Sequence, residues 1–191
     1  MSNAANIRQV TRDREATSRR ILEAARDLFA AHGYDQVTMR MIAAEAGANV
    51  ALVNRYFGTK AALFAEALAT GSTIESVIAG DPAGLASRLA HRLAVRLQSG
   101  ATEPVTRMVD RAGTSPEIQA ILRAHVEATV VKRIAAQLDG PHPEQRALLA
   151  ATMILGTGSV RRLFGPGVIE AVDAEEVEAR LRAMFEISLR P

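Results

Sequence analysis

Apolar residues recur along most of the chain with the three- and four-residue spacing of an α-helix. The first such stretch starts near Arg14 and stops at Gly33, and its apolar positions are Ile21, Leu22, Ala25, Leu28 and Phe29. No segment shows the convincing alternation with period two that marks a half-buried strand. The pattern therefore predicts an all-α protein.

Residues that can cap helices divide the next part of the chain. Thr38 and Asn49 each precede a helix of about two turns, and Gly47 lies in the short connection between them. Thr59 precedes a longer helix, which we expect to continue to about Ile78. These signals predict two short helices followed by a longer one.

Helices of greater length are predicted beyond Gly80. Asp81-Pro82 and Ser115-Pro116 are cap–proline pairs of the kind that begin helices. The expected helices span residues 81–98, 103–111, 115–138, 144–163 and 173–189. Residues 1–12, by contrast, are polar and aperiodic, and we expect a flexible arm whose first four residues look like a cloning remnant.

Composition strengthens the helical prediction and excludes several kinds of site. Aromatic residues make up only 4% of the chain, whereas Ala, Leu and Arg, which favour helices, are abundant. The absence of Cys excludes disulfides, thiolate zinc sites and a cysteine nucleophile. The longest uncharged run, residues 147–160, is shorter than the roughly 20 apolar residues of a membrane span. We therefore expect a buried helix there and no membrane partner.

The segment from Thr38 to Phe57 carries the chemistry. Two short helices joined through Gly47 and Asn49 form a helix-turn-helix, whose second helix enters the major groove of DNA. Residues 1–71 hold nine basic and seven acidic side chains, so the net charge of +2 lies in this part of the chain. A basic surplus at this end suits a nucleic-acid partner.

Residues 17–64 resemble the N-terminal signature of the TetR family of transcriptional regulators. The resemblance rests on Arg20-Ile21-Leu22-Glu23-Ala24-Ala25, Leu28-Phe29-Ala30, His32-Gly33-Tyr34, Val37-Thr38-Met39-Arg40, Ile42-Ala43, Ala46-Gly47-Ala48-Asn49, Tyr56-Phe57-Gly58-Thr59-Lys60 and Leu63-Phe64. It implies an arm over 1–12, a three-helix DNA-binding domain over 13–58 and a helical bundle for ligand binding and dimerisation over 59–191.

The same resemblance implies which side chains reach DNA. Arg40 is expected to reach DNA, the groove-facing side of the recognition helix is expected at bases, and Tyr56 and Lys60 are expected at phosphates. The full set is Arg40, Asn49, Val50, Ala51, Leu52, Asn54, Tyr56, Thr59 and Lys60. Asn54 can pair with adenine, and the apolar members can meet a thymine methyl. Leu52 fits the groove and the core equally well, Val53 and Phe57 fit the core, and the role of Arg55 stays open.

For the C-terminal part, the resemblance implies a cavity for a small molecule and a homodimer formed by the last two helices. Candidate ligand contacts are His91, Met108, His125 and Met153, although ordinary core or surface positions explain each of them as well. Glycines 156 and 158 suit a face that another helix approaches closely, and intramolecular packing explains them nearly as well. We expect neither a cofactor nor a metal.

The sequence thus predicts a cytoplasmic, ligand-responsive repressor that binds a palindromic operator in double-stranded DNA as a homodimer and has no enzymatic activity. Two alternatives remain. A helical hydrolase would need a catalytic signature, and the sequence contains no Ser-His-Asp, zincin or phosphate-loop motif. A helical protein-interaction adaptor would lack the salt-dependent DNA affinity of a phosphate-contacting protein.

Overall fold

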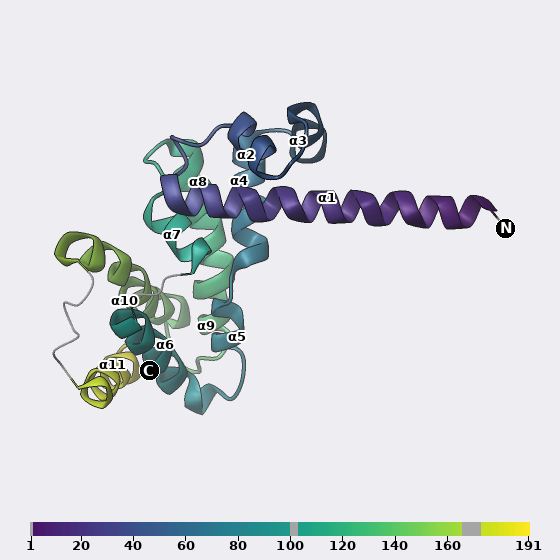
Figure 1. Ribbon diagram of the computed structural model, residues 1–191. Coiled ribbons are helices and arrows are strands. Elements are labelled where there is room, and N and C mark those ends of the chain that lie inside the picture. Colours follow the sequence, from purple (N-terminus) through teal and green to yellow (C-terminus); the bar gives the residue numbers. More distant parts are fainter. Residues whose placement is uncertain (1, 100–102, 166–172) are drawn as a thin grey trace. The chain divides into compact units, whose positions relative to one another are not determined.

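The computed structural model describes residues 2–99, 103–165 and 173–191, and these ranges contain helices and no strand (Figure 1). This confirms the predicted all-α fold. The chain divides into two compact units. One comprises the residues up to Gly71 together with Arg107–Leu122, and the other comprises Ser72–Thr106 and Arg123–Pro191.

The first unit is built on a long N-terminal helix, α1 (Ser2–His32), which packs against α2 (Met39–Glu45) and α4 (Lys60–Gly71). The second short helix, α3 (Val50–Phe57), packs on α2 and α4 (Figure 1). The α1 backbone includes residues 2–12, where the sequence predicts a flexible arm. The difference has a local reason, because no Gly or Pro interrupts the helix before Gly33.

An aromatic cluster holds the centre of this unit. The ring of Phe29 on α1 meets the ring of Phe64 on α4 edge-to-face, with centroids 5.1 Å apart, and Tyr34 completes the group. Leu63, Phe64 and Ala67 of α4 are all fully buried. The first unit therefore extends past residue 58, where the sequence predicts the domain boundary, because α4 belongs to the core around α1.

The second unit contains α5 (Ile74–Ile78), the short 3₁₀ turn η1 (Pro82–Gly84), α6 (Leu85–Ser99), α10 (Pro143–Phe164) and α11 (Ala174–Leu189). Helix α6 packs against α5, α10 and α11. The core of this unit, to which the segment 127–135 also contributes, consists of aliphatic side chains with a single Phe: Ile74, Ile78, Leu85, Leu89, Ala90, Leu93, Val130, Ile134, Ala147, Ala150, Ala151, Ile154, Phe185 and Leu189.

Two predicted helices are subdivided in the structure. The helix expected from Thr59 to Ile78 is interrupted after Gly71, and α5 begins at Ile74. The helix expected over 115–138 runs as α8 (Pro116–Val126), the π-helical turn η2 (Glu127–Val131) and α9 (Lys132–Ala135). The short helix α7 (Pro104–Asp110) precedes them, close to its predicted limits.

Residues 60–78 are long and apolar enough to cross a membrane by composition alone. This stretch is α4 and α5, and its larger apolar residues are buried within the protein: Leu63, Phe64, Leu68, Ile74 and Ile78. A buried core segment passes the same composition test, so the segment is explained by the protein's own packing.

Candidate nucleic-acid interface and ligand cavity

Side-chain caps fix the two helices of the helix-turn-helix. The Thr38 hydroxyl accepts a hydrogen bond from the Met41 amide at 3.2 Å, and the Asn49 side chain accepts one from the Ala51 amide at 2.8 Å. Both residues have the extended backbone expected of N-caps. Gly47 adopts a φ of 58° in the connection, a region that glycine enters without steric cost. These features confirm the predicted limits of both helices.

The outer face of α3 combines small, apolar and polar groups. Ala51, Asn54 and Arg55 are exposed, whereas Val50 and Leu52 are half-buried. The opposite face is apolar and faces the core, with Val53 and Phe57 buried as expected. Leu52, which fits groove and core equally well from the sequence, occupies an intermediate position in the structure as well.

Further polar groups surround this face. Arg40 is exposed near the start of α2. Thr59 is exposed, and its hydroxyl accepts a hydrogen bond from the Ala62 amide at 3.1 Å, as expected of the cap of α4. The Arg14 guanidinium lies over the ring of half-buried Tyr56, 5.5 Å from its centroid. Arg14 therefore places a positive charge beside Tyr56, a position expected at a phosphate.

Lys60 is held within the first unit. Its Nζ donates hydrogen bonds to the carbonyl oxygens of Tyr34 and Val37, both at 3.0 Å. The same ammonium lies 4.1 Å from the centroid of the Tyr34 ring. The sequence points to a phosphate contact at Lys60, and the structure adds a structural role that links the start of α4 to the connection between α1 and α2.

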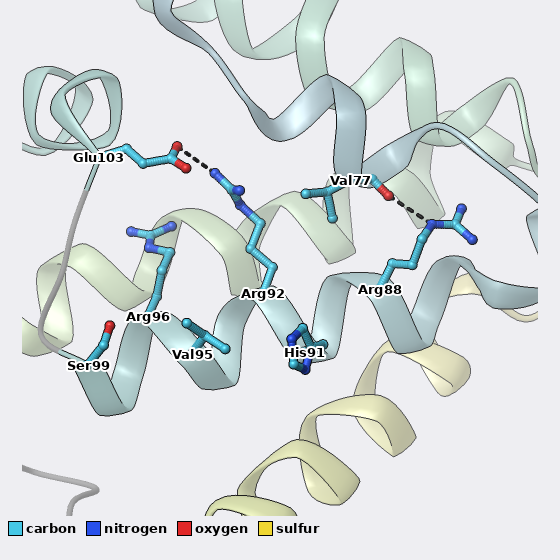
Figure 2. Close-up of a pocket in the computed structure, with 8 residues that line it drawn as sticks. All are labelled: Val77, Arg88, His91, Arg92, Val95, Arg96, Ser99 and Glu103. Atoms are coloured by element: carbon cyan, nitrogen blue, oxygen red, sulfur yellow. Dashed lines mark hydrogen bonds and ion pairs between the residues drawn. The ribbon is translucent and has the colours of Figure 1, made fainter.

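A cavity of about 610 Å³ lies in the second unit along α6 (Figure 2). Its lining is Val77, Arg88, His91, Arg92, Val95, Arg96, Ser99 and Glu103. The volume falls within the usual range for small-molecule sites, about 300–1,000 Å³. Three arginines and one carboxylate give this lining a net positive charge, and the two valines supply apolar surface.

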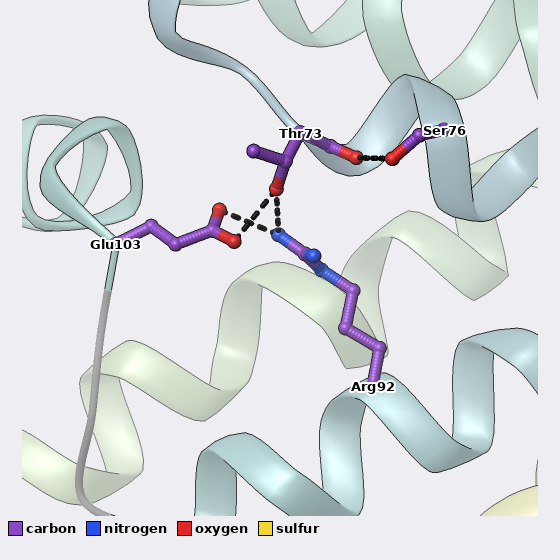
Figure 3. Close-up of polar contacts among 4 residues, drawn as sticks. All are labelled: Thr73, Ser76, Arg92 and Glu103. Carbon is purple, nitrogen blue, oxygen red and sulfur yellow. Dashed lines mark hydrogen bonds and ion pairs between the residues drawn. The ribbon is translucent and has the colours of Figure 1, made fainter.

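Two of the lining residues, Arg92 and Glu103, form a hydrogen-bonded triad with Thr73 (Figure 3). Arg92 Nη2 donates to Glu103 Oε2 at 2.6 Å and to Thr73 Oγ1 at 3.0 Å. The Thr73 hydroxyl in turn donates to Glu103 Oε1 at 2.6 Å. Each oxygen of the Glu103 carboxylate therefore has one strong partner.

Arg88 contacts backbone carbonyls and not a carboxylate. Its guanidinium donates to the backbone carbonyls of Val77, Ile78 and Asp81 at 2.8–3.0 Å. Figure 2 shows the first of these contacts. These carbonyls lie at and just beyond the end of α5, where helix carbonyl groups lack partners within the helix. Arg88 thus joins α6 to the end of α5 and forms one end of the cavity.

The groups around Glu103 shift the pKa of its carboxyl. Burial alone would raise the pKa of this carboxyl, but the hydrogen bonds from Thr73 and Arg92 and the charges of Arg92 and Arg96 together lower it below the ordinary value. Glu103 is therefore an anion at neutral pH, paired with Arg92 and stabilised further by the charge of Arg96.

The four candidate ligand contacts occupy different surroundings. His91 lines the cavity at its exposed edge, and its Nδ1 lies 2.9 Å from Glu178 Oε2. Met153 packs against the core of the second unit, and Met108 is fully buried in the first unit. His125 is half-buried, and burial lowers its pKa despite the opposing charge of Glu75. Of the four, the structure places His91 in the cavity lining.

Sequence analysis missed most of the cavity residues. The available signal was the spacing of Arg88, Arg92 and Arg96, since residues four apart lie on one face of a helix. Glu103 gave no comparable signal, because its pairing with Arg92 depends on how the chain returns to α6. The contact of Arg14 with Tyr56 was likewise hidden, since 42 residues separate the two positions.

Known protein families match both the N-terminal and the C-terminal part of the chain. The sequence model of bacterial regulatory proteins of the tetR family matches residues 21–67. The model of the tetracyclin repressor-like C-terminal domain matches residues 83–188, more than half of the chain. An HTH-type transcriptional repressor of Streptomyces coelicolor is 51% identical over 57 residues, and this match spans 30% of each protein's length.

Solved structures resemble the chain over nearly its full length. A TetR-family regulator from Streptomyces coelicolor A3 has a TM-score of 0.62 and 23% identity, over 93% of this chain and 96% of that one. A transcriptional regulator from Rhodococcus sp. Rha1 has a TM-score of 0.61 and 25% identity, over 91% of this chain and 96% of that one. The first of these likenesses shows a shared fold, whereas the family-model matches concern the sequence itself.

Proposed function

The chain belongs to the TetR family of bacterial regulatory proteins, and we propose that it is a transcriptional repressor that binds a palindromic operator and leaves it when a small molecule binds. The family is one of regulatory proteins, so the alternative of a helical hydrolase is set aside. The observation that carries the proposal is the capped helix-turn-helix with the exposed outer face of α3.

The chemistry of this face suits the major groove, which is about 12 Å wide and admits one helix. Asn54 can form paired hydrogen bonds with adenine, and Ala51 can contact a thymine methyl. Arg40 supplies an exposed guanidinium near the start of α2. We expect Tyr56 and Thr59 to contact phosphates, and the Arg14 charge next to Tyr56 supports this for Tyr56. Arg55 is exposed in the last turn of α3 and adds positive charge to the same face.

A homodimer is part of the proposal because a palindrome needs two recognition helices, about 34–36 Å apart. Helix α10 supports it with a stripe of exposed positions at helical spacing. Its large apolar members are Leu148, Leu149, Leu155, Val160 and Leu163. Gly156 lies on the same stripe and has open space where a Cβ would point. On α11, Met184 and Ile187 are exposed one turn apart. An exposed apolar surface of this kind marks an interaction site.

The second unit supports the ligand response through its cavity along α6. A ligand bound there changes operator affinity only if it prefers one of two arrangements of the protein, with a coupling of typically 1–3 kcal/mol. We expect the protein to act in the bacterial cytoplasm, where its DNA partner is found.

The test is a DNA selection from a random library with the full chain, followed by fluorescence anisotropy on the selected duplex at low and physiological salt. We expect a palindromic site, and we expect Arg40→Ala to weaken binding about tenfold, a free-energy difference of about 1.4 kcal/mol. Arg180→Ala removes an exposed arginine of α11 and serves as the matched control.

A protein that selects no sequence, or whose DNA affinity ignores both salt and the Arg40→Ala change, would contradict the proposal. That result would favour the protein-interaction adaptor, since contacts to phosphates lose affinity steeply as salt rises.

A further inference from the structure

We propose that the cavity along α6 takes an anionic amphiphile, a carboxylate on an apolar body, whose charged group replaces the Glu103 carboxylate against Arg92. The inference rests on the proposed function, since it names the chemical class of the effector. Four observations carry it: the charge of the lining, an unused donor on Arg92, the apolar surface beside it, and the position of Glu103 in the chain.

The lining carries more positive than negative charge. Arg88, Arg92 and Arg96 face the cavity, against the single carboxylate of Glu103 (Figure 2). Each of the three nitrogens of the Arg88 guanidinium donates to a backbone carbonyl, a group that carries no net charge. At the other end of the cavity Arg92 is paired with the Glu103 carboxylate, and the positive charge of the lining as a whole favours an anion there over a neutral or cationic group.

Arg92 has a donor that the protein leaves unused. Its Nη2 serves both Glu103 and Thr73, whereas its Nε is buried and has no hydrogen-bond partner among the described residues. A buried donor without an acceptor is destabilising, because it has lost its hydrogen bond to water and gained none in return. A ligand carboxylate can accept a hydrogen bond from Arg92 Nε and another from Nη2, because a carboxylate accepts two parallel hydrogen bonds from one guanidinium.

Apolar surface lies next to these charges. Val95, three residues after Arg92 and next to Arg96 on α6, is 47% exposed, and Val77 lines the same cavity (Figure 2). Small-molecule sites combine such apolar lining with a few polar groups that fix the ligand's orientation. The cavity therefore suits a molecule with an apolar body and one charged end.

Glu103 occupies a position from which its release can be transmitted. It directly precedes α7, and from Arg107 onward the chain belongs to the first unit. Thr73, its other partner, follows the end of α4 by two residues. The triad thus ties together two of the three places where the chain passes between the units. A ligand carboxylate that displaces Glu103 breaks this connection between the two chain segments.

The experiment is isothermal titration calorimetry of the full chain with decanoate, 1-decanol and decylamine at pH 7.5, below their aggregation limits. We expect decanoate to bind at least tenfold more tightly than either uncharged decanol or cationic decylamine. We expect Arg92→Gln to weaken decanoate binding at least tenfold, and Glu103→Gln to strengthen it several-fold because the competing carboxylate is gone.

Arg133→Gln and Glu75→Gln are the matched controls. These residues form an ion pair with 3.0 Å between Arg133 Nη2 and Glu75 Oε2, and neither lines the cavity. Both controls are expected to bind decanoate within twofold of the unmodified protein. The opposite signs expected at Arg92 and Glu103 separate the proposal from general destabilisation, which would weaken binding in both variants.

The inference is overturned if decanoate fails to bind at millimolar concentration, if decanol binds as tightly, or if Glu103→Gln weakens binding. No DNA is present in this titration, so its outcome is independent of the operator test. A protein that binds decanoate but no operator would disprove the repressor and leave the ligand site standing.

Discussion

Lys60 illustrates how one side chain can serve both the fold and the DNA surface. An ammonium group has three donors, and two of them are used by the carbonyls of Tyr34 and Val37. The contact with the Tyr34 ring adds a cation–π interaction worth about 0.5–1 kcal/mol at exposed sites. The expected phosphate contact would therefore use a lysine that the fold has already oriented.

Replacement of Lys60 by Met tests this dual role. Methionine keeps an unbranched apolar side chain but cannot donate to the two carbonyls. We expect a loss of about 2 kcal/mol, since hydrogen bonds from charged donors contribute roughly 1.5–3 kcal/mol each and this site is partly exposed. The measurement is thermal unfolding followed by circular dichroism. Lys132→Met, which removes an exposed lysine paired with Glu127, is the control and should lower the melting temperature far less, because an exposed ion pair contributes little to stability. Equal melting of the two variants would mean that Lys60 has no structural role.

At the scale of elements, the turn after α7 is fitted against the end of α1 within the first unit. The Arg111 guanidinium donates to the carbonyl of Ala31. Gly33 ends α1 with a φ of 78°, and a Cβ there would lie 2.7 Å from the Arg111 carbonyl oxygen. On the other side, a Cβ on Gly113 would lie 2.5 Å from the Asp35 carboxylate. Two glycines thus permit the close approach that places residues 107–122 in the first unit.

This fit predicts different costs for two glycine substitutions. Gly33→Ala meets both a positive φ and the Arg111 backbone, so we expect a loss of about 2–3 kcal/mol. Gly47→Ala also has a positive φ but nothing within 4 Å of the added Cβ, so about 1 kcal/mol is expected. Urea unfolding of both variants measures the difference. If the two variants lose the same free energy of unfolding within error, the turn at Arg111 moves aside at no measurable cost, and the close approach contributes little to stability.

At the scale of the whole molecule, the exposed apolar stripe of α10 and the neighbouring positions of α11 need a covering surface. Leu163 is 79% exposed and Ile187 is 70% exposed. Full burial of such a side chain contributes about 1.5–3 kcal/mol. A symmetric dimer repeats each contact, because the same patch meets itself across the twofold axis.

We therefore expect Leu163→Glu and Ile187→Glu to convert the protein from dimer to monomer in sedimentation equilibrium. A charge placed in an apolar interface loses its hydration without gaining a partner. Met41→Glu alters an exposed apolar residue of α2 and should leave the dimer intact. Dimers that persist in both interface variants would show that another surface joins the two copies.

The sequence by itself determined where most helices begin and end. Caps at Thr38, Asn49 and Thr59 and the glycine at the end of α1 act over a few residues, so their effect is legible in the local sequence. The apolar periodicity likewise identified the buried faces of the helices, and the motif of the helix-turn-helix followed from both. Residues on the outer face of α3 could be predicted because a short helix with one buried face leaves the rest exposed.

Only the tertiary structure decided what depends on contacts between distant residues. It interrupted the fourth helix at Gly71 and joined residues 107–122 to the N-terminal unit. It turned Lys60 toward carbonyls 23 and 26 residues away and brought Glu103 to Arg92. Helical periodicity shows which side of a helix a residue occupies but not which distant group will face it. The local sequence pattern therefore determines the fold class, whereas the packing of the chain determines which charged groups meet at the cavity.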